Sequence, residues 1–146
     1  MHVYVPPAPR PEVAGLGAAR CLVDGLAWLA DDGEVTAVAV DGDRHLLAVI
    51  ACGATSGRVL AGDVRPVLRP AVALGATAIA VVVLGRVDDH ELDRARADLA
   101  RGAELVELGL MGVVAHERGD PGEVPGPVTL AGGEGVVQTS RRSASP

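Results

Sequence analysis

The chain of 146 residues contains no phenylalanine, lysine or asparagine, and its aromatic residues are one tryptophan and one tyrosine. Without phenylalanine, the core must be built from valine, leucine and alanine, and large aromatic anchors are excluded. Without lysine, no side-chain amine is available for acylation or isopeptide conjugation. Because the missing residues all have AT-rich codons, we interpret this bias as the mark of a GC-rich genome and not of a function.

Cysteine is scarce as well, since the chain has only Cys21 and Cys52, which are far apart. Their spacing excludes a CxxC motif and a zinc knuckle, and two reduced thiols are typical of a cytosolic protein. The first residues do not resemble a signal peptide, and the longest apolar run, Ala76 to Leu84, is too short to span a bilayer. We therefore expect a soluble cytoplasmic protein with no membrane association.

Apolar residues make up 49% of the chain, which excludes a disordered protein. The length fits one domain that buries roughly 70% of its extended surface. The formal net charge of −6 argues against nonspecific binding to nucleic acid, whose affinity comes largely from neutralised phosphates. The arginines that form a possible local cluster are interpreted as solvated helix faces: Arg65, Arg69, Arg86, Arg94, Arg96 and Arg101.

The pattern of apolar residues predicts a single domain over residues 14–140. It is preceded by a proline-rich lead-in over residues 1–13 and followed by a polar tail over 141–146. The lead-in fits polyproline geometry without a partner. The expected fold class is α/β (α+β), with a central mixed sheet flanked by helices on both sides. Helices are predicted at 14–30, 63–74 and 88–108, a loop or short strand at 53–62, and strands at 34–40, 46–52, 76–84, 110–115, 128–130 and 135–139.

The helix predicted at 63–74 contains two prolines. Asp63 is suited to the N-cap, and Pro66 is tolerated in the first turn. Pro70 removes a hydrogen bond from the helix interior, so the helix either begins near Val67 or is kinked. The strand from Ala76 to Leu84 is apolar on both faces, which is typical of a central strand covered on two sides.

This order of elements resembles the RadC-like branch of the JAB/MPN (JAMM) metalloprotease family. The likeness covers roughly residues 14–140, and no single string within it is specific. The strings that carry it are Glu34-Val35, Asp41-Gly42, Gly53-Ala54-Thr55, Leu68-Arg69-Pro70-Ala71, Gly75-Ala76-Thr77-Ala78, Gly102 to Leu110, and Val128 to Gly132 with Thr139-Ser140.

The chain departs from that family at the zinc site. The resemblance implies a His-x-His-Pro motif after the buried strand, an acidic ligand one helical turn later, and a glutamate general base on the first strand. Here the strand ends in Leu84-Gly85-Arg86-Val87, and no histidine occurs between His45 and His90. Glu34 is the equivalent of the base and Glu91 that of the acidic ligand. Since both imidazoles are missing, we expect the zinc hydrolase activity to be lost.

An alternative is a rebuilt metal site made of His90 and Glu91 together with Glu34 or His116. His90 and Glu91 are adjacent on a helix, so their side chains diverge by about 100° and chelate poorly together. Helix capping alone accounts for the acidic run Asp88 to Glu91. His116 has an equally simple explanation as a polar residue at a strand end on the surface.

The leading hypothesis is a catalytically inactive JAB/RadC-like domain that serves as a protein-interaction or scaffold module. It has no cofactor and binds a protein partner or a second copy of itself. The alternative is a divergent zinc-dependent peptidase or isopeptidase, and a DNA-associated role comes last. One surface suited to self-association is the edge of the hairpin strand Val35 to Val40, if that strand is unpaired.

Overall fold

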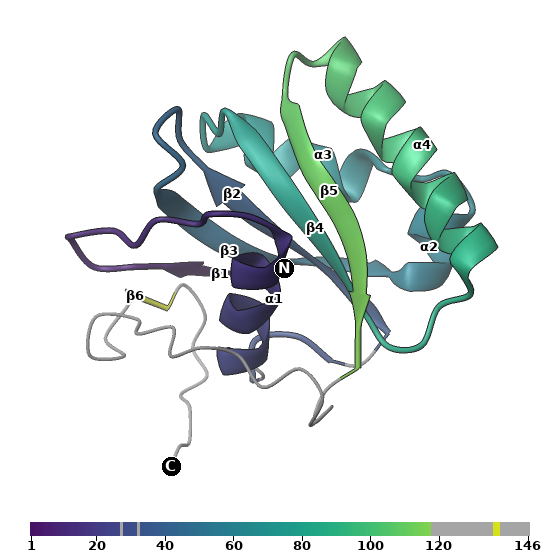
Figure 1. Cartoon of the computed structure of the whole chain (residues 1–146), viewed down its shortest axis with the longest axis horizontal. Coiled ribbons are helices and arrows are strands. Elements are labelled where there is room, and N and C mark those ends of the chain that lie inside the picture. The colour runs from purple at the N-terminus through teal and green to yellow at the C-terminus, as the bar shows by residue number, and fades with distance from the viewer. Residues whose placement is uncertain (27, 32, 118–135, 138–146) are drawn as a thin grey trace.

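The computed structural model describes residues 1–26, 28–31, 33–117 and 136–137. Within them lies one six-stranded sheet with the order β5-β4-β2-β3-β1-β6. Helix α1 covers one face, and α2, α3 and α4 cover the other (Figure 1). The predicted α/β (α+β) class, with one mixed sheet between helices, is confirmed. The strands are β1 His2–Val5, β2 Glu34–Val40, β3 Leu46–Thr55, β4 Ala78–Leu84, β5 Gly109–His116 and β6 Val136–Val137, and the helices are α1 Leu16–Gly25, α2 Ser56–Leu60, α3 Arg65–Ala73 and α4 Asp89–Leu105.

Strand β2 lies in the middle of the sheet, antiparallel to both β3 and β4. Its pairing with β4 runs from Val35 opposite Val83 to Val40 opposite Ala78. The condition set for self-association through this strand, a free edge, is therefore not met, because β3 and β4 pair with it on its two sides along almost its whole length. Strands β4 and β5 are parallel and are joined by α4, which crosses over one face.

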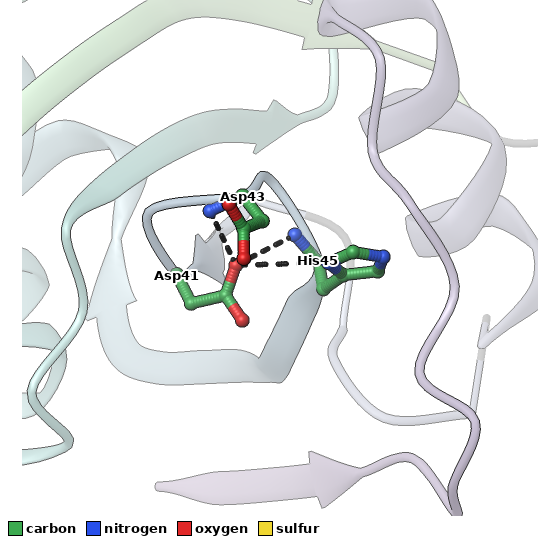
Figure 2. Close-up of side chains that lie close together, drawn as sticks. All are labelled: Asp41, Asp43 and His45. Carbon is green, nitrogen blue, oxygen red and sulfur yellow. Dashed lines mark hydrogen bonds and ion pairs between the residues drawn. The ribbon is translucent and has the colours of Figure 1, made fainter.

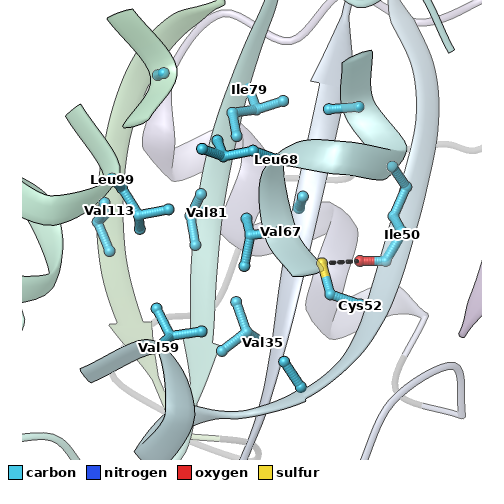
Figure 3. Close-up of a cluster of buried hydrophobic side chains, with 14 of the residues drawn as sticks. Val35, Ile50, Cys52, Val59, Val67, Leu68, Ile79, Val81, Leu99 and Val113 are labelled. Atoms are coloured by element: carbon cyan, nitrogen blue, oxygen red, sulfur yellow. Dashed lines mark hydrogen bonds between the residues drawn. The ribbon is translucent and has the colours of Figure 1, made fainter. Parts of the chain in front are cut away.

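The alternation of side chains on β2 divides the core into two apolar clusters. Val35, Ala37 and Ala39 belong to the cluster beneath α2, α3 and α4, where Figure 3 shows Val35 beside Val59 and Val67. Val38 and Val40 belong to the cluster beneath α1. Both faces of the strand are buried, which explains why its residues after Glu34 are small or branched and, apart from Thr36, apolar.

The N-terminal segment is part of the sheet. Residues His2–Val5 form β1, which pairs antiparallel with β3, and Tyr4 is only 2% exposed. The prediction of a polyproline segment without a partner is wrong for these residues, since the outer edge of β3 offers backbone groups that β1 satisfies. The prolines follow this strand, and a backbone hydrogen bond from the Leu46 amide to the Pro11 carbonyl holds the segment on the domain.

Several element boundaries differ from the sequence prediction. Helix α1 ends at Gly25 and not near residue 30, although Leu26 and Leu29 remain buried. The loop expected after residue 53 contains the end of β3 and the short helix α2, whose N-cap Thr55 accepts a hydrogen bond from the Arg58 amide. The strand predicted at 128–130 lies outside the described residues.

Helix α3 begins at Arg65 and runs through Pro70, so it starts before Val67 and its N-cap residue is Val64 and not Asp63. Asp63 instead forms ion pairs with Arg58 and Arg65. None of the described helices combines the length and apolar character needed to cross a membrane.

Candidate functional site

Three segments singled out in the sequence meet at the carboxyl end of β4. The Gly33 amide, next to Glu34, donates to the Leu84 carbonyl at 2.7 Å, and the Gly85 amide donates to the His116 carbonyl at 2.9 Å. The segments around Glu34, Leu84 and His116 therefore share one end of the sheet. Ligand sites of α/β proteins are often found at this end of parallel strands.

The carboxylate of Glu34 is directed away from β4. One oxygen accepts from the Asp31 amide at 2.9 Å, and the other accepts from the Gly53 amide at 3.1 Å. Gly53 belongs to β3, which lies on the opposite side of β2 from β4. Gly53 has φ +73°, a conformation that glycine adopts readily. Glu34 therefore stabilises the backbone where β2 begins and β3 ends.

His116 is buried, with 5% of its surface exposed, and the expectation of a surface position is wrong. Its Nε2 atom lies 3.1 Å from a carboxylate oxygen of Asp24 on α1, which explains how a polar side chain is accommodated there. The contact between His116 and Asp24 links β5 to α1. A small open cleft of about 180 Å³ lies beside them, lined by Arg20, Gly85, Arg86, Val87, Ala115, His116 and Glu117.

His90 and Glu91 lie in the first turn of α4, and both are exposed. Asp88 is the N-cap residue in extended conformation, and Asp89 and Glu91 are the acidic residues of the first turn. Acidic side chains in this position are stabilised by the helix dipole. That effect accounts for the cluster without a ligand.

The structure does not bring Glu34, His90, Glu91 and His116 together. Among the described residues, the group of three or more potential ligands with atoms within 4.8 Å of one another is Asp41, Asp43 and His45. Glu34 begins β2 and its carboxylate bonds toward β3, whereas His116 ends β5, which lies two strands from β2 in the sheet order. At about 4.8 Å between neighbouring strands, β2 and β5 are roughly 10 Å apart.

The group Asp41, Asp43 and His45 surrounds the turn between β2 and β3 (Figure 2). A spacing of Asp-x-Asp-x-His at a turn is the signal that could have revealed it in the sequence. One Asp41 oxygen already accepts from the backbone amides of Asp43 and His45, each at 2.9 Å. The hydrogen bond from the His45 amide is the main reason that the pKa of Asp41 lies below its usual value. These contacts shape the hairpin turn and explain the residues without a metal.

A second surface feature is an apolar groove between α3 and α4, which we call the α3–α4 groove. It has a volume of about 470 Å³ and is lined by Val64, Arg65, Leu68, Arg69, Val72, Ala73, Gly102, Leu105 and Val106. Leu105 is 83% exposed, Val72 46% and Val106 44%. Sequence reasoning missed this groove, because the apolar residues at the end of α4 fit equally well into a buried face.

The outer edge of β5 is less suited to an interaction. Within the described residues β5 pairs only with β4, but Arg96 of α4 donates to the Val113 carbonyl at 3.2 Å. The register also shifts between Ile79 and Ala80 of β4, opposite Gly112. An irregular ladder and an occupied carbonyl both discourage the addition of another strand.

The chain matches no protein-family model, no curated protein and no solved structure.

Proposed function

We propose that this protein is a non-catalytic RadC-like JAB/MPN domain that acts as a protein-interaction module. Its docking surface is the α3–α4 groove, and its occupant is a segment of a protein partner. The observation that carries the proposal is the exposure of Leu105, Val72 and Val106 around one apolar hollow. Exposed apolar side chains gathered in a groove are typical of protein interaction sites, whereas scattered ones are not.

The contacts at the carboxyl end of β4 support the non-catalytic part of the proposal. The segment Leu84 to Val87 supplies no imidazole at the position that the family resemblance gives to the zinc ligands. Glu34 is engaged by two backbone amides, and His116 is engaged by Asp24. A hydrolase site would require these side chains to share one metal-binding cluster, and their ligand atoms are not grouped in this way among the described residues.

The energetics of burial support the groove as the docking surface. Covering a leucine side chain that is exposed to water stabilises a complex by about 1.5–3 kcal/mol. Leu105 is almost fully exposed, so a partner gains most of this amount by covering it. Val72 on α3 and Val106, the C-cap residue of α4, add smaller contributions from opposite walls, and both helices are already formed in the free protein.

The experiment compares the wild-type protein with Leu105→Glu and with the control Ala97→Glu. Ala97 is exposed on the same helix but does not line the groove. Each tagged protein is expressed in its native host, and the proteins cross-linked to it are identified. We expect at least one partner to be captured by the wild type and by Ala97→Glu and lost with Leu105→Glu.

Two results would contradict the proposal. Capture of the same proteins by Leu105→Glu as by the wild type would remove the groove as the docking surface. Purified wild-type protein that holds one equivalent of zinc and cleaves a peptide or isopeptide bond would remove the non-catalytic assignment. Both variants must retain the wild-type circular dichroism spectrum, which is expected because residues 97 and 105 are exposed.

A further inference from the structure

We infer that the segment bound in the α3–α4 groove is an amphipathic helix with acidic residues along its flank. This inference rests on the proposed function and deepens it by naming the chemistry of the partner. It depends on two features of the groove, namely walls formed by two helices and charged lining residues of a single sign.

The walls of the groove favour a helix as the occupant. Val64, Leu68 and Val72 follow one another at intervals of four residues along one side of α3, and Leu105 and Val106 end the opposite wall on α4. From residue 64 to residue 73 the α3 wall is roughly 14 Å long, at 1.5 Å per residue. A helix of about three turns fits this length and presents apolar side chains at i, i+4 and i+7.

Gly102 sets the depth of the groove between the two helices. A Cβ atom at this position would lie 2.7 Å from a Leu68 methyl carbon and 3.1 Å from a Val64 methyl carbon. The absence of a side chain therefore allows α4 to approach α3 closely, and Leu68 forms part of the groove floor. Two helices in such close contact present a continuous hollow into which the ridge of a third helix packs.

The charge of the lining identifies the flank of the partner. Arg65 and Arg69 are the charged residues of the lining, both are exposed, and no carboxylate is among the lining residues. They are four residues apart, so both guanidinium groups lie along the same side of α3. Arg65 has an acidic neighbour in Asp63 at 3.6 Å, but Asp63 also pairs with Arg58. Glutamates one turn apart on a bound helix complement this arginine pair.

The charge of the lining also disfavours a second copy of the chain as the occupant. In a two-fold dimer the same patch meets itself, so the two grooves would bring four arginines and no lining carboxylate into one interface. Like charges held close together oppose such a contact. A partner with acidic flanks avoids this repulsion.

The test measures binding of the full-length protein to designed helical peptides of about 18 residues by fluorescence anisotropy. One peptide carries leucines at i, i+4 and i+7 with glutamates on both flanks, a second has lysines in place of the glutamates, and a third has serines in place of the leucines. We expect the acidic peptide to bind roughly threefold to tenfold more tightly than the basic one, as expected for two exposed ion pairs. The serine peptide should not bind.

Variants connect the binding to the groove. Arg69→Glu should abolish or reverse the preference for the acidic peptide, Leu105→Glu should weaken both leucine peptides, and the control Ala97→Glu should change neither. Thermal unfolding of each variant checks that it is folded.

Three outcomes would overturn the inference. Equal binding of the acidic and basic peptides would refute the charge argument. Failure of both leucine peptides to bind would refute the helix, while capture of a partner that still depends on Leu105 would leave the proposed function in place. A dimer in sedimentation experiments that Leu105→Glu dissociates would identify a second copy as the occupant.

Discussion

Replacement of Glu34 by alanine separates a structural role of this residue from a role as a general base. Its carboxylate accepts hydrogen bonds from the Asp31 and Gly53 amides at 2.9 and 3.1 Å. A hydrogen bond to a charged group contributes about 1.5–3 kcal/mol in a buried site, but water can replace part of this where the group is exposed. Since Glu34 is partly exposed, we expect about 0.5–1 kcal/mol for each bond.

Glu34→Ala should therefore lower the free energy of unfolding by about 1–2 kcal/mol. Glu34→Gln keeps one acceptor oxygen and should lose about half as much. The assay is urea unfolding followed by circular dichroism, with Glu104→Ala as the control because Glu104 is exposed on α4. A surface substitution of this kind changes stability by less than about 0.5 kcal/mol. If Glu34→Ala unfolds at the same urea concentration as the wild type, the structural account of Glu34 is wrong.

Three further predictions concern buried groups. Burial raises the pKa of the Cys52 thiol to about 12. The native protein at pH 8 should therefore react with a thiol reagent only at the partly exposed Cys21, whereas both cysteines should react in urea. The Thr36 hydroxyl is buried without a hydrogen-bond partner among the described residues, so Thr36→Val should raise the free energy of unfolding by about 1 kcal/mol. A lower free energy of unfolding for this variant in chemical denaturation would contradict this. Asp24→Ala leaves the buried His116 Nε2 atom without its partner and should lower the free energy of unfolding by about 1–2 kcal/mol in the same assay. An unchanged midpoint of unfolding would show that the link to α1 contributes nothing to stability.

The sequence predicted the elements whose residues are constrained by burial on both faces. The bounds of β2 agree with the prediction, and β4 differs from it by two residues, because runs of valine and alanine between turn residues have few alternatives to a central strand. The sequence was less informative where neighbours in space decide the conformation. Residues 2–5 become a strand because β3 offers them an edge, and α3 continues through Pro70 because its other residues pack on the sheet.

The candidate site shows the same division. The sequence alone determined that the core is mainly aliphatic, that the strand Ala78–Leu84 is followed by no histidine motif, and that acidic residues begin the following helix, since these are properties of residue type and local spacing. The tertiary structure alone decided that Glu34 turns toward Gly53, that His116 is buried against Asp24, and that Leu105 faces a groove with Val72. Each of these outcomes depends on contacts between residues far apart in the chain, and the local sequence does not indicate which of these residues will be packed together.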